Sequence, residues 1–173
     1  KRGRGSARST GFKEAKGDVL FSTDADTVLP EDWIETFFTT LTKSNSVAVT
    51  SNNRIDDCGR TTNTVYNALQ PLFMRGYRVL LGHYWLSGFS FAMYKDIYEK
   101  SGGFKNELIA QEDIDLSFRV RKLGKIQYVP ELPVVLSGRR YRSGLMKGFL
   151  QHQSTFVETF LLRRKNVVLP DIR

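Results

Sequence analysis

The sequence predicts an α/β protein in which short strands alternate with amphipathic helices. Apolar runs such as residues 18–23 and 88–94 have the length and composition of strands buried in a sheet. The segments between such runs carry apolar residues at helical spacing. Forty per cent of the 173 residues are hydrophobic, which is enough for the packed core of one domain and excludes a wholly disordered chain.

The first three predicted elements are a helix over residues 7–16, a strand over 18–23 and a helix that begins at Pro30. Gly17 can adopt the left-handed conformation that ends a helix. Proline suits the first turn of a helix, because the amide hydrogen that it lacks would have no partner there. The predicted apolar stripe of this helix comprises Trp33, Ile34, Phe37, Phe38 and Leu41.

The middle of the chain is expected to contribute a strand over residues 46–50, a loop over 51–60 and a long helix over 61–81. Pro71 and Gly76 are expected to break or bend that helix. A further strand over 88–94 follows. The remaining elements are predicted to be a short helix to Lys100, a turn at Gly102-Gly103-Phe104, a helix over 112–123, a strand over 125–129 and an amphipathic helix over 144–164.

Charge is distributed unevenly along the chain. The net charge is +8, but residues 17–138 carry a net charge of −3, while the two ends together hold 14 basic and 3 acidic residues. A nucleic-acid-binding protein more often spreads basic side chains along one element, with aromatic side chains between them. An acidic centre between basic ends is consistent with a metal site beside a phosphate site.

Two further observations exclude classes of protein. The single cysteine, Cys58, excludes an internal disulfide framework and a cysteine-rich zinc site. Residues 79–94 form the longest apolar stretch free of charged side chains, and they are fewer than the roughly 20 residues that a membrane-spanning helix needs. Because the chain opens at Lys1 with neither methionine nor signal peptide, we expect it to begin inside a longer protein.

An acidic pair follows the first predicted strand. Asp24 and Asp26 are separated only by Ala25, and residues two apart in an extended chain point to the same side. Two such carboxylates repel each other unless a cation lies between them, and Mg²⁺ or Mn²⁺ prefers oxygen ligands of this kind. In the alternative interpretation, Asp26 caps the following turn and Asp24 is solvated.

A second acidic pair, Glu112 and Asp113, begins the helix predicted over 112–123. A carboxylate at such a junction can act as a general base that takes a proton from an acceptor hydroxyl, and a helix N-terminus favours its ionised form. Alternatively, Asp113 caps the helix and Glu112 is surface charge. We expect Arg119 to pair with Asp115, four residues earlier, rather than with substrate.

Three other features have two interpretations each. Residues 137–142 place three arginines beside Gly138, which suits bidentate phosphate contacts but is also typical of a solvated loop. Trp85 could stack on a sugar or a base, or pack in the core. His83 and His152 lack acidic or cysteine partners at ligand spacing, so we expect ordinary packed or exposed histidines.

The order of these motifs is more specific than any one of them. The motifs are Gly5-Ser-Ala-Arg8-Ser-Thr-Gly11-Phe12, Gly17-Asp18-Val-Leu-Phe, Asp24-Ala-Asp26 with Pro30, Gly88-Phe-Ser-Phe-Ala-Met, Gly102-Gly103-Phe104 and Glu112-Asp113-x-Asp115-Leu116. In order and spacing they resemble the family 2 glycosyltransferases of the GT-A fold. The resemblance covers roughly residues 3–142. It implies a Rossmann-like α/β fold with a mixed, mostly parallel sheet flanked by helices.

The resemblance also implies roles for the motif residues. Asp24 and Asp26 would bind the Mg²⁺ or Mn²⁺ that carries the nucleotide-sugar diphosphate, Asp113 would be the catalytic base, and Glu112 would be its partner. The implied reaction is a single displacement with inversion at the sugar C1. The residues expected to contact phosphate are Arg8, Arg139, Arg140 and Arg142. The residues expected to line the donor and acceptor pocket are Trp85, Gly88, Gly102 and Gly103.

The same resemblance predicts the organisation and partners of the protein. Residues 1–142 would form the C-terminal part of a GT-A catalytic domain, and residues 143–173 would form an amphipathic basic helix and tail. The N-terminal nucleotide-binding half of the family is absent, so we expect weak nucleotide binding, and self-association through the uncovered sheet. The expected partners are a nucleotide-sugar donor and a glycan or lipid-linked acceptor, with peripheral contact at the cytoplasmic face of a membrane and no nucleic acid.

Two alternatives from other classes stay open at this point. One is a basic module that binds nucleic acid or an anionic membrane, because apolar side chains such as Phe149 and Phe156 precede the basic run Arg163-Arg164-Lys165. The other is a nucleotidyltransferase, which would also use paired carboxylates and a metal. Only a nucleotidyltransferase would release pyrophosphate rather than a nucleoside diphosphate.

Overall fold

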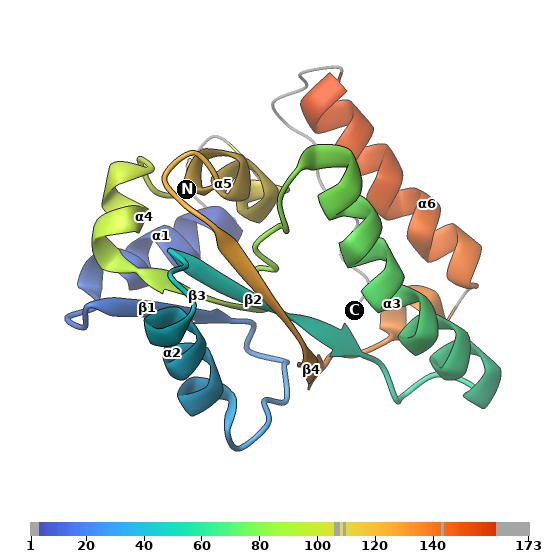
Figure 1. Ribbon diagram of the computed structural model, residues 1–173. Coiled ribbons are helices and arrows are strands. Elements are labelled where there is room, and N and C mark those ends of the chain that lie inside the picture. Colours follow the sequence, from blue (N-terminus) through green and yellow to red (C-terminus); the bar gives the residue numbers. More distant parts are fainter. Residues whose placement is uncertain (1–3, 106–107, 109, 143, 162–173) are drawn as a thin grey trace.

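A four-stranded sheet with the order β1-β3-β2-β4 forms the centre of the molecule (Figure 1). The computed structural model describes residues 4–105, 108, 110–142 and 144–161. The strands are β1 (Val19–Thr23), β2 (Ala48–Arg54), β3 (Ser90–Tyr94) and β4 (Ile126–Val135). β3 runs antiparallel to β1 and β2, while β2 and β4 are parallel, so three of the four strands point in one direction. The predicted mixed sheet is therefore confirmed, although only one of its three strand pairs is parallel.

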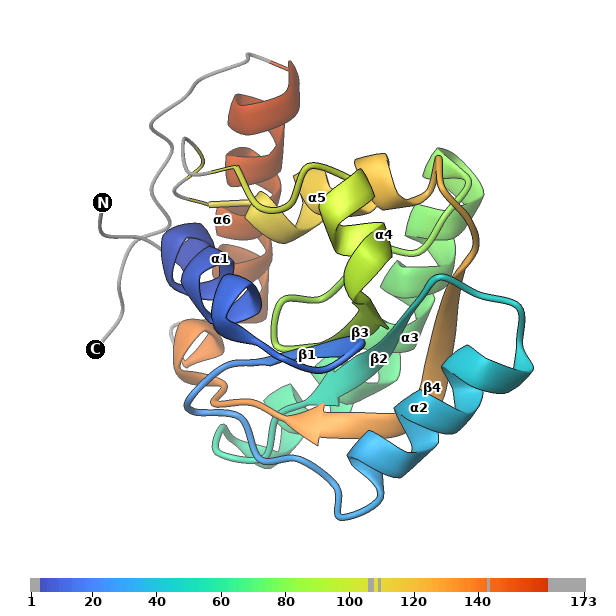
Figure 2. The same ribbon diagram turned by 90° about the vertical axis from the view of Figure 1, so that its left-hand side faces the viewer.

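Helices cover both faces of this sheet, as the two views in Figures 1 and 2 show. The helices are α1 (Arg4–Glu14), α2 (Trp33–Lys43), α3 (Arg60–Leu81), α4 (Lys95–Lys100), α5 (Glu112–Val120) and α6 (Leu145–Phe156). A 3₁₀ turn, η1 (Arg139–Tyr141), precedes α6, and a π-helical turn, η2 (Val157–Leu161), follows it. The predicted α/β class, with helices on both faces of a sheet, is confirmed.

Two buried clusters join these layers. On one face of the sheet, Phe12 of α1 and Leu116 of α5 pack in the same cluster as Phe91 of β3. On the other face, α2 buries Trp33 and Phe37. The apolar stripe of α2 is narrower than predicted, because two of its five predicted members, Ile34 and Phe38, are more than half exposed.

β2 continues beyond the strand predicted over 46–50, and the loop prediction for its last residues is wrong. Polar side chains occupy this extension, and the buried ones form hydrogen bonds. The Ser51 hydroxyl lies 2.6 Å from that of Ser90, and the Asn53 amide donates to the Tyr66 hydroxyl at 2.8 Å. Since hydrogen-bonded polar groups can be buried at low cost, the strand extends to Arg54. β4, which pairs with this extension, likewise runs past its predicted end at residue 129.

α3 runs without interruption through Pro71, contrary to the predicted break. Buried side chains on both sides of the proline hold the helix against its neighbours. Gln70 donates to the Asn53 side chain at 2.8 Å, and Met74 is fully buried. Gly82, with φ of 79°, then ends the helix in the left-handed conformation. Tertiary packing thus outweighs the local cost of the proline.

The C-terminal helix is shorter in the described region than the predicted helix over 144–164. α6 ends at Phe156, and the π-helical turn η2 carries the chain to Leu161. The predicted residues 162–164 lie outside the described part of the chain, as does the basic tail. Among the described residues, no helix combines the length and apolar character that crossing a bilayer requires.

Candidate active site

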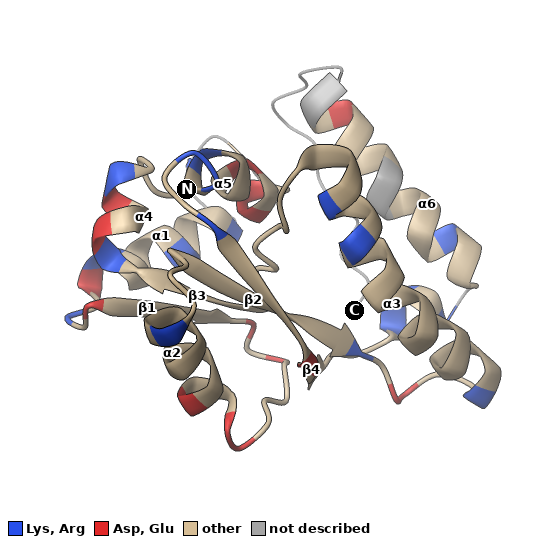
Figure 3. Ribbon diagram, in the orientation of Figure 1, with Lys and Arg blue, Asp and Glu red and all other residues tan. Residues whose placement is uncertain are grey.

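The loop after β1 carries the first predicted acidic pair, and Figure 3 shows acidic residues along this loop. Asp24 and Asp26 follow Thr23, the last residue of β1, at the carboxyl end of the strand. This is the edge at which open α/β sheets bind ligands. Each carboxylate pairs with a different arginine: Asp24 with Arg8 at 2.5 Å and Asp26 with Arg139 at 3.0 Å. Both predicted metal ligands are thus partly exposed and placed beside predicted phosphate-binding residues.

Arg8, on α1, joins the two acidic motifs. Its Nη2 pairs with Oδ1 of Asp24, and its Nη1 pairs with Oε1 of Glu112. The side chain of Arg8 is only 12% exposed. The surrounding carboxylates of Asp113, Asp24 and Glu112 raise the pKa of Arg8 against the opposing effect of burial, which is the largest single contribution. The guanidinium therefore remains charged and holds motifs that are far apart in the sequence at one point.

Glu112 is the most deeply buried of the predicted acidic residues, with a side chain 4% exposed. Burial and the adjacent Asp113 raise the pKa of Glu112 to about 7, although Arg8 acts in the opposite direction. Gly5 leaves room for the side chain of Glu112, because a Cβ on residue 5 would lie 3.2 Å from the Cβ of Glu112. The small residue thus lets α1 approach the start of α5 closely.

Asp113 is fixed by two backbone amides. Its Oδ2 accepts from the Gly88 N–H at 2.9 Å, and its Oδ1 accepts from the Ile114 N–H at 2.8 Å. The N-cap residue of α5 is Gln111, without a side-chain capping hydrogen bond, so the alternative in which Asp113 caps the helix is wrong. Gly88 is a predicted pocket residue, and its backbone orients the predicted base. The preceding Gln111 adopts a left-handed conformation, with φ of 63°, and such strain often accompanies functional sites.

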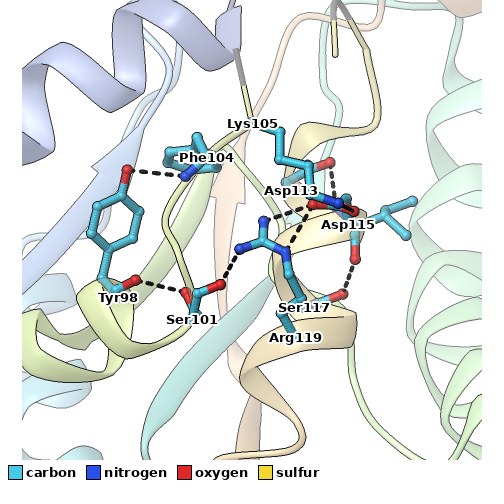
Figure 4. Close-up of polar contacts among 9 residues, drawn as sticks. Tyr98, Ser101, Phe104, Lys105, Asp113, Asp115, Ser117 and Arg119 are labelled. Atoms are coloured by element: carbon cyan, nitrogen blue, oxygen red, sulfur yellow. Dashed lines mark hydrogen bonds and ion pairs between the residues drawn. The ribbon is translucent and has the colours of Figure 1, made fainter. Parts of the chain in front are cut away.

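An ionic network behind Asp113 ties α5 to the glycine turn (Figure 4). Arg119 donates to Oδ2 of Asp115 through Nε at 3.0 Å and Nη2 at 2.6 Å, which confirms the predicted pairing. A third donor of Arg119, Nη1, bonds the carbonyl of Ser101, and Lys105 reaches the other oxygen of Asp115 at 2.9 Å. The network fixes both ends of the turn relative to the helix that carries Asp113.

The glycine turn itself lies beside a different hollow of the surface. Gly102 and Gly103 have φ of 80° and 62°, and a Cβ on Gly103 would lie 2.9 Å from the ring of Tyr98. Both glycines line an open cleft of about 540 Å³ between α1 and α4. The residues that line this cleft do not include Asp24 or Asp113 among the described residues. The structure links the turn that holds these two predicted pocket residues to the second acidic motif through Arg119 and Asp115.

Trp85 belongs to an aromatic cluster. Its ring meets that of Tyr77 edge-on, with 4.8 Å between centroids, and Tyr77 in turn contacts His83. His83 is buried, and burial lowers its pKa, consistent with the expectation of a packed histidine. The side chain of His152 lies outside the described part. In this cluster Trp85 has packing partners, while its predicted role at the pocket stays a prediction.

The basic segment at 137–142 is anchored by an acid that sequence reasoning missed. The carboxylate of Asp57 accepts from the Ser137 hydroxyl at 2.7 Å, the Gly138 N–H at 2.5 Å and Arg142 at 3.1 Å. These hydrogen bonds lower the pKa of Asp57. Asp57 lies in a loop about 80 residues from its partners, so no local pattern connects them; the only signal was an acidic pair beside Gly59.

The three arginines of this segment point to different partners. Arg139 reaches Asp26, whereas Arg142 reaches Asp57. Between them, Tyr141 packs against Tyr66 of α3 with 4.6 Å between ring centroids and the rings tilted by 49°, and Arg140 is half-buried. The structure therefore brings Arg139 to the acidic pair after β1, and it places Arg142 at the anchor.

The donor atoms of the acidic pair after β1 are of the kind that a hard divalent cation prefers. Asp24 and Asp26 offer only carboxylate oxygens, the ligand type that Mg²⁺ and Mn²⁺ prefer. Within the described ranges, no three His, Cys, Asp or Glu side chains are grouped as a complete metal site. Such an ion would therefore need oxygens from substrate phosphates or water, as Mg²⁺ sites commonly do.

Comparisons with known proteins identify the family and the fold. Residues 1–102 match the model of the family described as "Glycosyl transferase family 2". The fold is similar to that of mannosyltransferase PcManGT from Pyrobaculum calidifontis, solved in complex with GDP-Man and Mn²⁺, with a TM-score of 0.56 and 21% identity. That likeness covers 89% of this chain and 44% of the mannosyltransferase. No curated protein matches the sequence. Since the family model covers more than half of the residues, the chain belongs to glycosyl transferase family 2.

Proposed function

We propose that the protein transfers a sugar from a nucleoside-diphosphate sugar to an acceptor hydroxyl, with inversion at the sugar C1. One observation carries this proposal: Arg8 holds Asp24 and Glu112 on a single guanidinium, so the two acidic motifs form one site. The family supports sugar transfer as the reaction class. The structurally similar mannosyltransferase binds GDP-Man, which supports a nucleotide-sugar donor.

The proposed mechanism assigns the proton transfer to Asp113. Its carboxylate, oriented by the Gly88 N–H, takes the proton of the acceptor hydroxyl. The acceptor oxygen then forms a bond to C1 from the side opposite the diphosphate, and the bond from C1 to the phosphate oxygen breaks. Positively charged groups, among them Arg139, stabilise the negative charge of the leaving diphosphate. A glycan or lipid-linked hydroxyl would fill the acceptor position.

Asp24 and Asp26 are the proposed ligands of a Mg²⁺ or Mn²⁺ ion. When bound, the ion would neutralise charge on the diphosphate and so assist its departure. The presence of Mn²⁺ with GDP-Man in the similar mannosyltransferase supports this choice of cation. Arg139, which pairs with Asp26, would lie next to the bound phosphates.

The metal assignment predicts that Asp26→Asn weakens Mn²⁺ binding by at least about tenfold, because one anionic ligand is lost. Isothermal titration calorimetry with Mn²⁺, alone and in the presence of GDP or UDP, measures the change. Asp18→Asn is the matched control, since Asp18 is exposed just before the opposite end of β1. Equal Mn²⁺ affinity in the two variants would contradict the assignment. In turnover assays, release of pyrophosphate instead of a nucleoside diphosphate would favour a nucleotidyltransferase.

A second proposal concerns the surface formed by α3 and α6, which we propose contacts an anionic membrane. The two helices touch where Phe73 stacks on Phe149, with 5.0 Å between ring centroids. Large apolar side chains are exposed on both helices, and Val79 and Leu80 are more than 80% exposed. The exposed apolar residues are Val65, Leu69, Leu72, Phe73, Val79 and Leu80 on α3 and Met146 and Leu150 on α6.

Charge on this surface favours anionic lipid over other partners. Residues 58–95 contain no aspartate or glutamate, and Arg75 and Arg78 of α3 are exposed. α6 likewise contains no acidic residue and exposes Lys147 beside Met146. Apolar side chains among exclusively basic charges are typical of surfaces that lie in the headgroup region of a membrane.

Replacing Val79 and Leu80 together by serine is expected to weaken binding to phosphatidylglycerol-containing vesicles by roughly tenfold, because two exposed apolar side chains are lost. Co-sedimentation with vesicles of phosphatidylcholine, with and without phosphatidylglycerol, measures this. The matched control replaces Ile34 and Phe38, which are exposed on α2. An equal loss in both double variants, or binding that ignores the anionic lipid, would argue against this surface.

A further inference from the structure

Arg8 occupies an unusual position for an active-site arginine. It lies between the proposed metal ligand Asp24 and Glu112 and forms an ion pair with each of them. The two carboxylates are separated by 16 and 104 residues from Arg8 in the sequence. No other described cation forms an ion pair with two of the four predicted acidic residues, Asp24, Asp26, Glu112 and Asp113.

We propose that Arg8 is the internal counter-ion of this site: it holds Asp24 and Glu112 together until a divalent cation binds, and it then releases Asp24 while it remains paired with Glu112. The inference rests on the proposed metal site at Asp24 and Asp26. It concerns how the carboxylates are held in place before the cation binds, and it makes Arg8 a positioning residue for both acidic motifs.

The backbone around Arg8 leaves room for the guanidinium at this point. A Cβ on Gly88 would lie 2.6 Å from Nη2 and 2.7 Å from Cζ of Arg8, so only glycine fits while Arg8 stays there. Gly5, one turn before Arg8 on α1, clears the approach to Glu112 in the same way. Glycines in two separate segments thus leave space for the ion pair between Arg8 and Glu112, as a permanent internal counter-ion requires.

Electrostatics predicts that a divalent cation and Arg8 compete for the carboxylate of Asp24. A divalent cation and the Arg8 guanidinium carry like charge, and both would bind the carboxylate of Asp24 within a partly buried site where charges interact strongly. Glu112 is almost fully buried, so it retains the guanidinium as its partner. On leaving Asp24, Arg8 has free donors beside the incoming phosphates, which agrees with the phosphate contact predicted for it. Because such coupling is reciprocal, anything that strengthens the Arg8–Asp24 pair weakens cation binding.

The test compares Mn²⁺ affinity in two variants that both lack the Glu112 charge. In Glu112→Gln, Arg8 has Asp24 as its remaining ion-pair partner, so Mn²⁺ is expected to bind more weakly than in the wild type. In the double variant Arg8→Gln/Glu112→Gln the competitor is gone, and Mn²⁺ is expected to bind at least about fivefold more tightly than in Glu112→Gln. Calorimetry with Mn²⁺ alone is the measurement, and no turnover is needed.

Controls separate this inference from the metal site itself. Lys13→Gln removes an exposed positive charge from the same helix and is expected to leave Mn²⁺ affinity unchanged within about twofold. Equal Mn²⁺ affinity in Glu112→Gln and in the double variant, with binding still abolished by Asp24→Asn, overturns the role of Arg8 and leaves the metal site intact. Binding that is unaffected by Asp24→Asn overturns both. Should the double variant fail to fold, Arg8→Lys, whose single ammonium cannot bridge two carboxylates as a guanidinium does, is expected to bind Mn²⁺ more tightly than wild type.

Discussion

Asp113→Asn is expected to lower the rate of sugar transfer by about a thousandfold while leaving donor affinity nearly unchanged. The amide has almost the same shape as the carboxylate, and its single oxygen can still accept the hydrogen bond from the Gly88 N–H, while the bond from the Ile114 N–H is lost. The amide cannot take a proton from the acceptor hydroxyl. Rate measurements on the full-length protein, together with calorimetric donor binding, separate the two effects.

Asp115→Asn provides the matched control for that experiment. It makes the same chemical change two residues further along α5, where the carboxylate pairs with Arg119 and Lys105 instead of facing Gly88. We expect this variant to retain transfer within about tenfold, since it loosens the support of the glycine turn without removing the base. Normal transfer by Asp113→Asn, or an equal loss in both variants, would show that Asp113 is not the base.

Glu112 is expected to make the free energy of unfolding fall as the pH rises from about 4.5 to about 7. Burial and the neighbouring Asp113 raise its pKa from 4.5 to about 7, so within this range the folded protein keeps a proton that the unfolded chain has released. Stability from this group is therefore fully present below pH 4.5 and is lost by pH 7. A pKa change of that size corresponds to about 3 kcal/mol.

Urea unfolding of the wild type and Glu112→Gln at a series of pH values measures this effect. The variant lacks the titrating group, so the free energy of unfolding of the variant minus that of the wild type is expected to increase from about pH 4.5 to about pH 7 and then to stay constant. Any pH-independent cost of leaving Arg8 with Asp24 alone shifts the whole difference without altering its slope. Glu131→Gln, at an exposed position in β4, is the control. Parallel curves for the wild type and Glu112→Gln would contradict the raised pKa of Glu112.

Local patterns identified the secondary structure wherever the governing contacts lie within a few residues. The strand at β3, the short helix α4 and the start of α5 at Glu112 all follow from apolar runs and helix signals in their own segments. The extension of β2 did not, because the burial of Asn53 depends on Tyr66 and Gln70 of α3. The continuity of α3 through Pro71 likewise depends on contacts with residues far away in the sequence, and the residues next to Pro71 do not reveal these contacts.

The same distinction applies to the candidate site. Both acidic pairs were identified from spacing alone, since each is a short motif at the end of an element. How they meet was not predictable from the sequence, because Arg8 was assigned to phosphate and its pairing with Glu112 spans 104 residues. Asp57 was missed for the same reason, because its structural role depends on hydrogen bonds to the segment at 137–142, which is distant in the sequence.

The position of β1 in the sheet determines how its amides behave toward solvent. β1 pairs with β3 along one edge, and no strand of the described part of the chain lies along its other edge. In an antiparallel pair, alternate backbone N–H groups point away from the partner strand. Those amides of β1 would exchange with deuterium rapidly unless a further strand, from this protein or a second copy, is added there. Deuterium uptake in Val19–Thr23 thus reports directly what the outer edge of this sheet meets in solution.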